Sequence, residues 1–265
     1  MKVHTGRADL HIHTLASDGV SSVEQILNRA EELELDVIAI TDHERVDAGH
    51  AAQAMARARG LHVEVIVGEE VSTRGGHVVA LFIEQRIRPW QSIGATVAQV
   101  HEQGGLAVIA HPLVPYPLCA SGRSIRRLLA NPDPRFHPDA IEALNPTTAG
   151  TRWGQQVPAF IEQLGLPAVA ASDAHRAADV AAAYTTFAGS TAQDLRHAIV
   201  AGTTGWAGEA YPVGHQLNTF RGQLAKHVAA LRDEARGKLL RDGTGRDLGY
   251  PGGRHRPARL DESQL

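Results

Sequence analysis

The amino-acid sequence predicts an α/β protein in which about seven short strands alternate with helices and close into a barrel. Two observations support this fold class. First, short apolar runs alternate along the chain with longer stretches whose apolar residues recur at helical spacing. Second, the short runs, such as Val37–Thr41, are apolar at successive positions, as expected when both faces of a sheet are covered. A chain of 265 residues with 43% hydrophobic residues can bury one substantial core.

The elements follow in order along the chain. Ser21-Ser22 opens the first helix, and Gly104-Gly105 ends the third with a C-cap signal. The connection Gly68–His77 is too short for a crossover helix, so the strands on either side of it are expected to be locally irregular. The expected strands are Ala8–His13, Val37–Thr41, Val63–Val67, Val78–Ile83, Ala107–Ala110, Ala140–Leu144 and Ala168–Ala171, with Thr185–Ala188 as a short extra strand. The expected helices follow Ser21-Ser22 and span Ala48–Arg59, Ile93–Glu102, Ser124–Ala130, Arg152–Leu164 and Thr191–Ala201.

The character of the chain changes toward its C-terminus. We assign residues 1–214 to the barrel domain. Within residues 215–241, apolar residues recur at helical spacing and predict one amphipathic helix; they are Leu217, Phe220, Leu224, Val228 and Leu231. Residues 242–265 are dominated by Gly, Pro and Arg and are expected to form a disordered tail.

Composition limits the classes of function. A formal net charge of −3 argues against binding nucleic acid through a large basic surface, but it does not exclude a local positive pocket, so a nucleic-acid partner is disfavoured and not excluded. Cys119 is the single cysteine, which excludes an intrachain disulfide and fits a reducing cytoplasm. The N-terminus lacks the apolar segment of a signal peptide, and no apolar run is long enough to span a membrane. We therefore expect a cytoplasmic protein without a membrane partner, and the sequence leaves its oligomeric state open.

Histidines are unusually frequent and fall at particular places. The chain has 15 His, more than its 5 Phe, 4 Tyr and 3 Trp together. His11 and His13 end the first predicted strand, and residues two apart on a strand share a face. Other ligand-type residues lie at or just beyond strand ends, the edge at which barrel enzymes build their sites. They are Asp18, Asp42 and His43, Glu69 and Glu70, His77, His111, and Asp173 with His175.

Each of these motifs alone has an ordinary structural explanation, such as a helix cap or a solvated loop. Their coincidence on several strands is hard to explain by capping, and it indicates a metal site. Imidazole and carboxylate together suit zinc, manganese or iron. Because the ligands are too many for one tetrahedral ion, we expect two or three divalent ions with a bridging carboxylate.

Taken in order, the motifs Asp9-Leu10-His11-Ile12-His13, Thr41-Asp42-His43, Gly68-Glu69-Glu70, Ala110-His111-Pro112 and Ser172-Asp173-Ala174-His175 resemble those of the PHP (polymerase and histidinol phosphatase) superfamily. The resemblance covers residues 8–201 and implies a distorted (β/α)7 barrel with a trinuclear metal site. It implies that His11, His13 and Asp173 hold one ion, that Glu70 bridges it to a second, and that His77 and His111 complete the second. Asp18, His43 and His175 would hold the third ion. Glu69 is the alternative bridge, and some relatives carry His in place of Asp18.

Within the superfamily the chain looks like the short stand-alone phosphoesterases, because only residues 78–110 separate His77 from His111. The leading hypothesis is hydrolysis of a small phosphorylated metabolite or nucleotide by a hydroxide held between the metals. Asp173 would orient or deprotonate the water, and His43 or His175 would assist the leaving group. Arg123 and Arg74 are candidate phosphate ligands. The alternatives are an amidohydrolase-like C–N or C–O hydrolase on the same metals, a manganese- or zinc-dependent nuclease, and a metal-binding module without catalysis.

Overall fold

The computed structural model describes residues 4–212. Its strands are β1 (Thr5–Asp9), β2 (Val37–Ile40), β3 (Glu64–Thr73), β4 (Gly76–Leu81), β5 (Leu106–Ile109), β6 (Ala140–Leu144), β7 (Ala168–Ala170), β8 (Ala183–Ala188) and β9 (Gly205–Gly208). Its α-helices are α1 (Val23–Glu32), α2 (Asp47–Arg59), α3 (Ile93–Glu102), α4 (Gly122–Leu129), α5 (Pro146–Ala149), α6 (Val157–Leu164) and α7 (Ala192–Ala201). The predicted C-terminal helix (215–241) and tail (242–265) lie outside the described residues.

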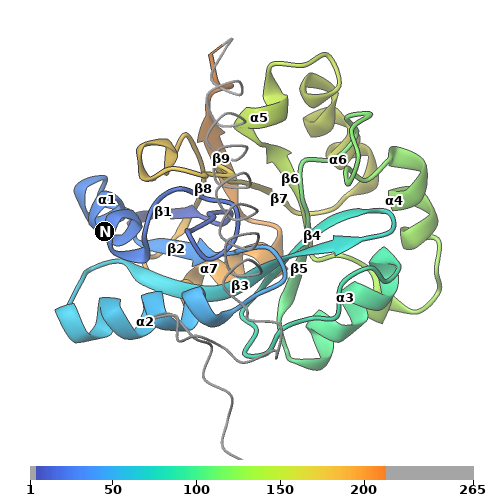
Figure 1. The fold of residues 1–265 in the computed structure, drawn as a ribbon. Coiled ribbons are helices and arrows are strands. Elements are labelled where there is room, and N and C mark those ends of the chain that lie inside the picture. Colours follow the sequence, from blue (N-terminus) through green and yellow to red (C-terminus); the bar gives the residue numbers. More distant parts are fainter. Residues whose placement is uncertain (1–3, 213–265) are drawn as a thin grey trace, which may run out of the picture. The chain divides into compact units, whose positions relative to one another are not determined.

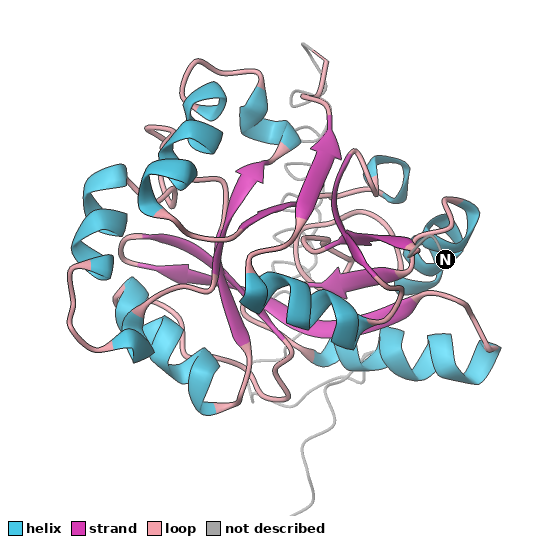
Figure 2. Cartoon of the chain, turned by 180° about the vertical axis from the view of Figure 1, so that it is seen from behind, coloured by secondary structure: helices cyan, strands magenta, loops and turns pink. Residues whose placement is uncertain are grey.

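One sheet curls into a nearly closed barrel, and helices surround it (Figures 1 and 2). The strand order is β7-β6-β5-β4-β3-β2-β1-β8-β9, with parallel pairs from β1 to β3 and from β5 to β7. This arrangement confirms the predicted α/β barrel. The strand Gly205–Gly208 was not expected from the sequence, because two of its four residues are glycine and it carries no apolar run.

The irregular pair of strands expected around the short Gly68–His77 connection is a hairpin. β4 runs antiparallel to both β3 and β5, and the register places Ser72 opposite His77. Because β4 extends the pairing, β3 continues to Thr73, six residues beyond the predicted end at Val67. Gly76 in the turn has φ of +140°, and a Cβ there would lie 2.5 Å from the backbone nitrogen of Ala120. Glu70 therefore lies within a strand and not in a loop after one.

The interior of the barrel is filled by small and medium side chains from its strands, including Ala8, Ala39, Ala110 and Ala140. Leu195 and Ile199 of α7 belong to the same apolar cluster. Since β8 is antiparallel to β1, the helix that follows β8 starts at the end of the barrel where β1 begins. The core is thus covered at that end, and the opposite end, where the parallel strands terminate, carries the polar residues.

Two further apolar clusters attach the helices to the outside of the sheet. One packs α1 and α2 against β2 and β3, and the other packs α3, α4 and α6 against β4, β5 and β6. A capping box of Ser22 and Gln25 starts α1, and another of Thr191 and Asp194 starts α7. No helix of the described chain is long and apolar enough to cross a membrane.

Candidate metal centre

His11 and His13 lie where the chain beyond β1 meets the chain beyond β7. Ile12 forms a parallel bridge with Ala174, and the backbone nitrogen of His13 donates to the Ala174 oxygen at 2.8 Å. Ile12 points into the apolar cluster under α1 and α2, so the flanking His11 and His13 point the other way. Both imidazoles are fully buried. The same pairing brings Asp173 and His175 to this site.

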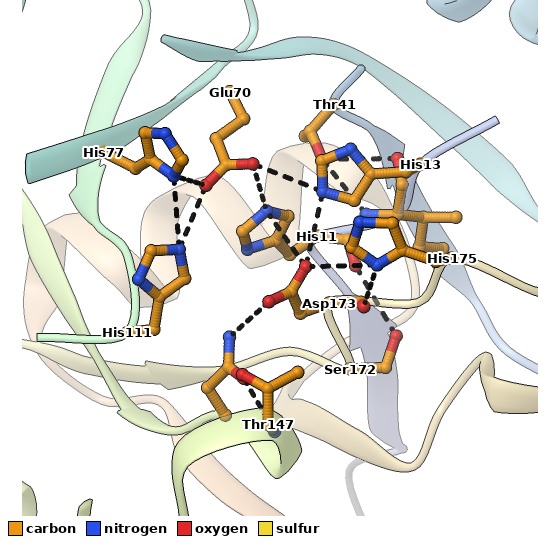
Figure 3. Close-up of polar contacts among 12 residues, drawn as sticks. His11, His13, Thr41, Glu70, His77, His111, Thr147, Ser172, Asp173 and His175 are labelled. Carbon is orange, nitrogen blue, oxygen red and sulfur yellow. Dashed lines mark hydrogen bonds and ion pairs between the residues drawn. The ribbon is translucent and has the colours of Figure 1, made fainter. Parts of the chain in front are cut away.

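Glu70 occupies the middle of the site because β3 is longer than expected. A bridge pairs Glu70 with His43, which follows β2, and His77 of β4 lies near it because its partner Ser72 is two residues along the same strand. His111 follows β5. Nine predicted ligands that lie on or just beyond six strands therefore converge at one rim, and Figure 3 shows seven of them with their contacts.

The two oxygens of the Glu70 carboxylate face different imidazoles. Oε2 lies 3.2 Å from His11 Nε2, 3.3 Å from His13 Nε2 and 3.3 Å from His43 Nδ1. Oε1 lies 2.6 Å from His77 Nδ1 and 3.1 Å from His111 Nε2. Each oxygen is therefore placed with its own set of imidazole nitrogens, so this carboxylate could bridge two ions.

Two aspartates complete the cluster. Asp173 Oδ1 lies 3.3 Å from His13 Nε2 and 3.7 Å from His11 Nε2. Asp18 Oδ2 lies 3.0 Å from His175 Nε2 and 3.7 Å from His43 Nε2. Asp18 is the most exposed member, with 36% of its side chain accessible, so the site opens on this side.

The electrostatics of the site favour positive charge. Burial raises the pKa of Glu70, but the surrounding imidazoles outweigh it and hold this pKa well below its usual range. The same balance lowers the pKa of Asp173. Burial lowers the pKa of His13, yet the carboxylates of Asp173 and Glu70 raise it to about 10. Burial also raises the pKa of Asp18, but His175, His13 and His43 outweigh it and hold this pKa below its usual range. Three ionised carboxylates therefore demand cations, which either protons or metal ions can supply.

The residues present fit divalent ions. His11 Nε2 and both ring nitrogens of His13 are buried and, within residues 4–212, have no partner in hydrogen-bond geometry. Buried polar atoms are normally satisfied, so three such nitrogens at one point indicate a ligand. Four overlapping groups of side chains each bring their ligand atoms within 4.8 Å of one another. These groups are His11-His13-Glu70, His13-Asp18-His43, His13-Asp173-His175 and His43-Glu70-His77.

The two adjacent glutamates point to opposite sides of β3. Glu69 accepts a hydrogen bond from the backbone nitrogen of Ile87 at 2.7 Å, and its Oε1 lies 4.0 Å from Arg86 Nε. Burial raises the pKa of Glu69 to about 7. Only Glu70 contacts the imidazoles.

The two predicted phosphate-binding arginines are not brought to the cluster. Arg74 lies four strand residues beyond Glu70, roughly 13 Å along the chain, and its Nε donates to the Trp90 oxygen. Arg123 lies exposed in the first turn of α4. Neither forms a hydrogen bond or an ion pair with the nine side chains of the cluster in the part of the chain that is described. A cavity of about 440 Å³ beside His43 is instead lined by Arg45 and Arg86.

Several residues support the cluster although the sequence assigned them no metal-binding or catalytic role. Asp42 accepts from the backbone nitrogens of Thr14 and Ser17 and so holds the loop that carries Asp18. Asp9 accepts from the backbone nitrogen and hydroxyl of Ser172, which precedes Asp173. Glu142 and Asn145 contact His11 and Asp173, respectively. The signal in the sequence was a carboxylate inside an apolar run, since a buried charge requires partners.

Comparisons with known proteins agree with this geometry. Residues 9–113 match the family described as the PHP domain, and residues 152–204 match the family described as PHP-associated. An uncharacterized protein of Methanocaldococcus jannaschii is 35% identical over 120 residues, which cover 41% of this chain and 69% of that protein. The 5′-3′ exoribonuclease Rnm of Salmonella typhimurium is 40% identical over 80 residues, which cover 29% of this chain but only 27% of the exoribonuclease.

Solved structures share the fold. A two-domain protein from Bacteroides vulgatus, containing a predicted PHP-like metal-dependent phosphoesterase, superposes with a TM-score of 0.63 at 18% identity, over 84% of this chain and 70% of that one. An amidohydrolase from Chromobacterium violaceum, with bound sulfate, has a TM-score of 0.54 at 20% identity, over 65% of this chain and 89% of that one. The matched families, the relatives and the barrel together show that the chain belongs to the PHP family of metal-dependent hydrolases.

Proposed function

We propose that this protein is a phosphoesterase that hydrolyses a small phosphorylated metabolite or nucleotide, with two or three divalent ions held by the nine converging side chains. The observation that carries the proposal is the Glu70 carboxylate, whose two oxygens each lie within 3.3 Å of separate imidazoles. Imidazole and carboxylate ligands favour zinc, manganese or iron over calcium and magnesium.

Glu70 divides the cluster into ligand sets. His11, His13 and Asp173 would hold one ion on the side of Oε2, and His77 and His111 a second on the side of Oε1. Asp18, His43 and His175 would hold a third. When bound, such ions neutralise phosphoryl oxygens and lower the pKa of water toward neutrality.

We assign the catalytic roles from the exposure of each side chain and from the hydrogen bonds that hold it in place. Asp173 would orient and deprotonate the attacking water, since its Oδ1 faces the cluster while Asn145 donates to its Oδ2 at 3.3 Å. His43 would assist the leaving group, because at 24% it has the most exposed side chain among the six imidazoles. His175, beside Asp18, is the second candidate for that role.

The arginine assignment changes with the geometry. Arg86 borders the cavity beside His43, and 56% of its side chain is accessible, so we assign it the role of pairing with substrate phosphate. Arg45 borders the same cavity, but its guanidinium forms a bidentate pair with Asp47. Arg74 and Arg123 remain candidates only for parts of a substrate that extend away from the cluster.

A second candidate function is cleavage of short ribonucleotides. The similarity to 5′-3′ exoribonucleases supports it. A diphosphodiesterase of Eggerthella lenta, 32% identical over 83 residues, supports the small phosphorylated metabolite instead, because its name specifies phosphoribosyl 1,2-cyclic phosphate. That match covers 29% of this chain and 31% of the diphosphodiesterase. Hydrolysis of an amide, an activity of the same fold in the amidohydrolase, is the third.

The experiment is a metal count combined with a substrate panel. Protein purified without chelators is analysed for its elements and assayed on phosphomonoesters, a cyclic phosphodiester, 5′-phosphorylated oligoribonucleotides and amides, with His11→Ala as control. Two or three ions per chain and phosphate release lost in His11→Ala are expected. Less than one ion and no turnover that depends on His11 would overturn the proposal, and turnover of amides alone would replace it.

A further inference from the structure

Glu142 is a buried carboxylate at the centre of β6 that the proposed mechanism does not use. Its side chain is about 1% exposed. Oε1 lies 2.8 Å from His11 Nδ1. Oε2 accepts from the backbone nitrogen of His111 at 2.7 Å and from Asn145 Nδ2 at 3.0 Å. Both oxygens are thus occupied by protein groups.

The partner set constrains the chemistry of this side chain. The His111 backbone nitrogen and Asn145 Nδ2 are donors, and an ionised carboxylate accepts at both of its oxygens. A neutral imidazole carries one N–H and one lone pair, so a His11 that donates from Nδ1 to Glu142 presents its lone pair at Nε2. That nitrogen is the one that lies 3.2 Å from Glu70 and 3.7 Å from Asp173.

We propose that Glu142 is a positioning residue that fixes the Nδ1–H tautomer of His11 and the place of the His111 backbone, so that both imidazoles present Nε2 to the metal centre. This role rests on the proposed function. Asn145 extends the network, because its Nδ2 also donates to Asp173 Oδ2 at 3.3 Å. One carboxylate thereby connects ligands that follow β1, β5 and β7.

The substitution Glu142→Gln tests this without changing the shape of the side chain. An amide has one accepting oxygen and one donating nitrogen, so in either orientation the nitrogen faces a donor. The amide nitrogen then faces either the His111 and Asn145 donors or His11 Nδ1. In the second case His11 accepts at Nδ1 and moves its proton to Nε2, where an ion would bind. Loss of such support around a metal ligand typically weakens metal affinity about 10- to 100-fold.

Glu69→Gln is the matched control. Glu69 is also a buried strand carboxylate, adjacent to Glu70, but it accepts only from the Ile87 nitrogen, and its Oε1 has no hydrogen-bond partner among the described residues. Its nearest donor is Arg86 Nε at 4.0 Å, beyond hydrogen-bond distance, so an amide nitrogen there removes a weak ion pair and no hydrogen bond.

The Kd for zinc is measured by competition with a chromophoric chelator, and a thermal melt of the metal-free protein reports folding. We expect a 10- to 100-fold higher Kd for Glu142→Gln and less than a threefold change for Glu69→Gln. Glu142→Gln that binds zinc like the wild type overturns the role of Glu142. Wild-type protein that binds neither zinc nor manganese nor iron instead overturns the proposed function, and the role of Glu142 with it.

A second measurement does not depend on how the variant folds. In nitrogen-15 spectra of the zinc-loaded wild-type protein, His11 should carry its proton on Nδ1 and bind the ion through Nε2. A proton on Nε2 would overturn the proposal even if Glu142→Gln cannot be purified.

Discussion

Two threonine side chains bridge the gap between the two ends of the sheet: Thr185 of β8, and Thr204 just before β9, whose hydroxyl donates to the Ala168 oxygen at 2.6 Å. β7 and β9 are the terminal strands of the described sheet, and β7 has no backbone ladder with β8. Thr185 of β8 is fully buried; its hydroxyl donates to the Ala170 oxygen at 2.8 Å and accepts from the Ala170 nitrogen at 3.0 Å. Its position makes it the link between β8 and the strand that leads to Asp173.

Replacing Thr185 with valine keeps the shape and removes both bonds. The Ala170 N–H and C=O would then be buried and unpaired, at about 1–3 kcal/mol each. Valine no longer has a hydroxyl to desolvate, which returns about 1–2 kcal/mol. The two groups together cost about 2–6 kcal/mol, so the expected net loss in the free energy of unfolding is about 1–4 kcal/mol, centred near 2.5 kcal/mol. For a domain of this size the central value corresponds to a fall in Tm of roughly 5–10 °C.

Urea unfolding followed by circular dichroism measures this loss, with Thr186→Val as the control. Thr186 is the next residue on β8, points to the other face and is only partly buried. The same chemical change there should alter the free energy of unfolding by less than about 0.5 kcal/mol. If Thr185→Val is within about 1 kcal/mol of the wild type, Thr185 does not hold the barrel closed.

Four other predictions address the site and the fold. Glu70→Gln should lower the number of ions per chain by at least one in elemental analysis, because its two oxygens serve separate imidazoles, whereas Glu69→Gln should keep the wild-type number. In Asp42→Asn an amide nitrogen faces the donors of Thr14 and Ser17, so the free energy of unfolding in urea should fall by about 1–3 kcal/mol. An unchanged value would contradict the role of Asp42 in holding the loop that carries Asp18. Removing metal with a chelator should lower the Tm of the wild type more than that of His11→Ala, since ligands that bind only the native state stabilise it. Both ring nitrogens of His101 face acceptors, which raises its pKa above 6.5. The contribution of His101 to stability should therefore be complete below about pH 6.5 and disappear as the pH rises through the raised pKa. If His101→Gln is destabilised equally at pH 6 and pH 9, this prediction is wrong.

Much of the fold follows from local patterns. The apolar runs at Val37–Thr41 and Ala140–Leu144 become buried strands because only a covered sheet tolerates side chains of that kind on both faces. The predicted ligand His111 lies directly after the parallel strand β5, where the sequence analysis placed it. The rule fails for Glu70, whose strand is extended by pairing with β4, a contact between strands that the strand's own composition does not encode.

Distance along the sequence does not predict distance from the cluster, as Arg74 and Glu142 show in opposite ways. Arg74 is close to Glu70 in sequence. An extended strand has a larger rise per residue than a helix, however, so Arg74 lies far from the cluster in space. Glu142 stands inside an apolar run far from every ligand in sequence, yet its Oε1 lies 2.8 Å from His11. A charged side chain inside a buried strand requires polar partners, and in a barrel such partners lie near the polar rim. A carboxylate within a buried strand is therefore better evidence for membership of a site than an arginine next to one.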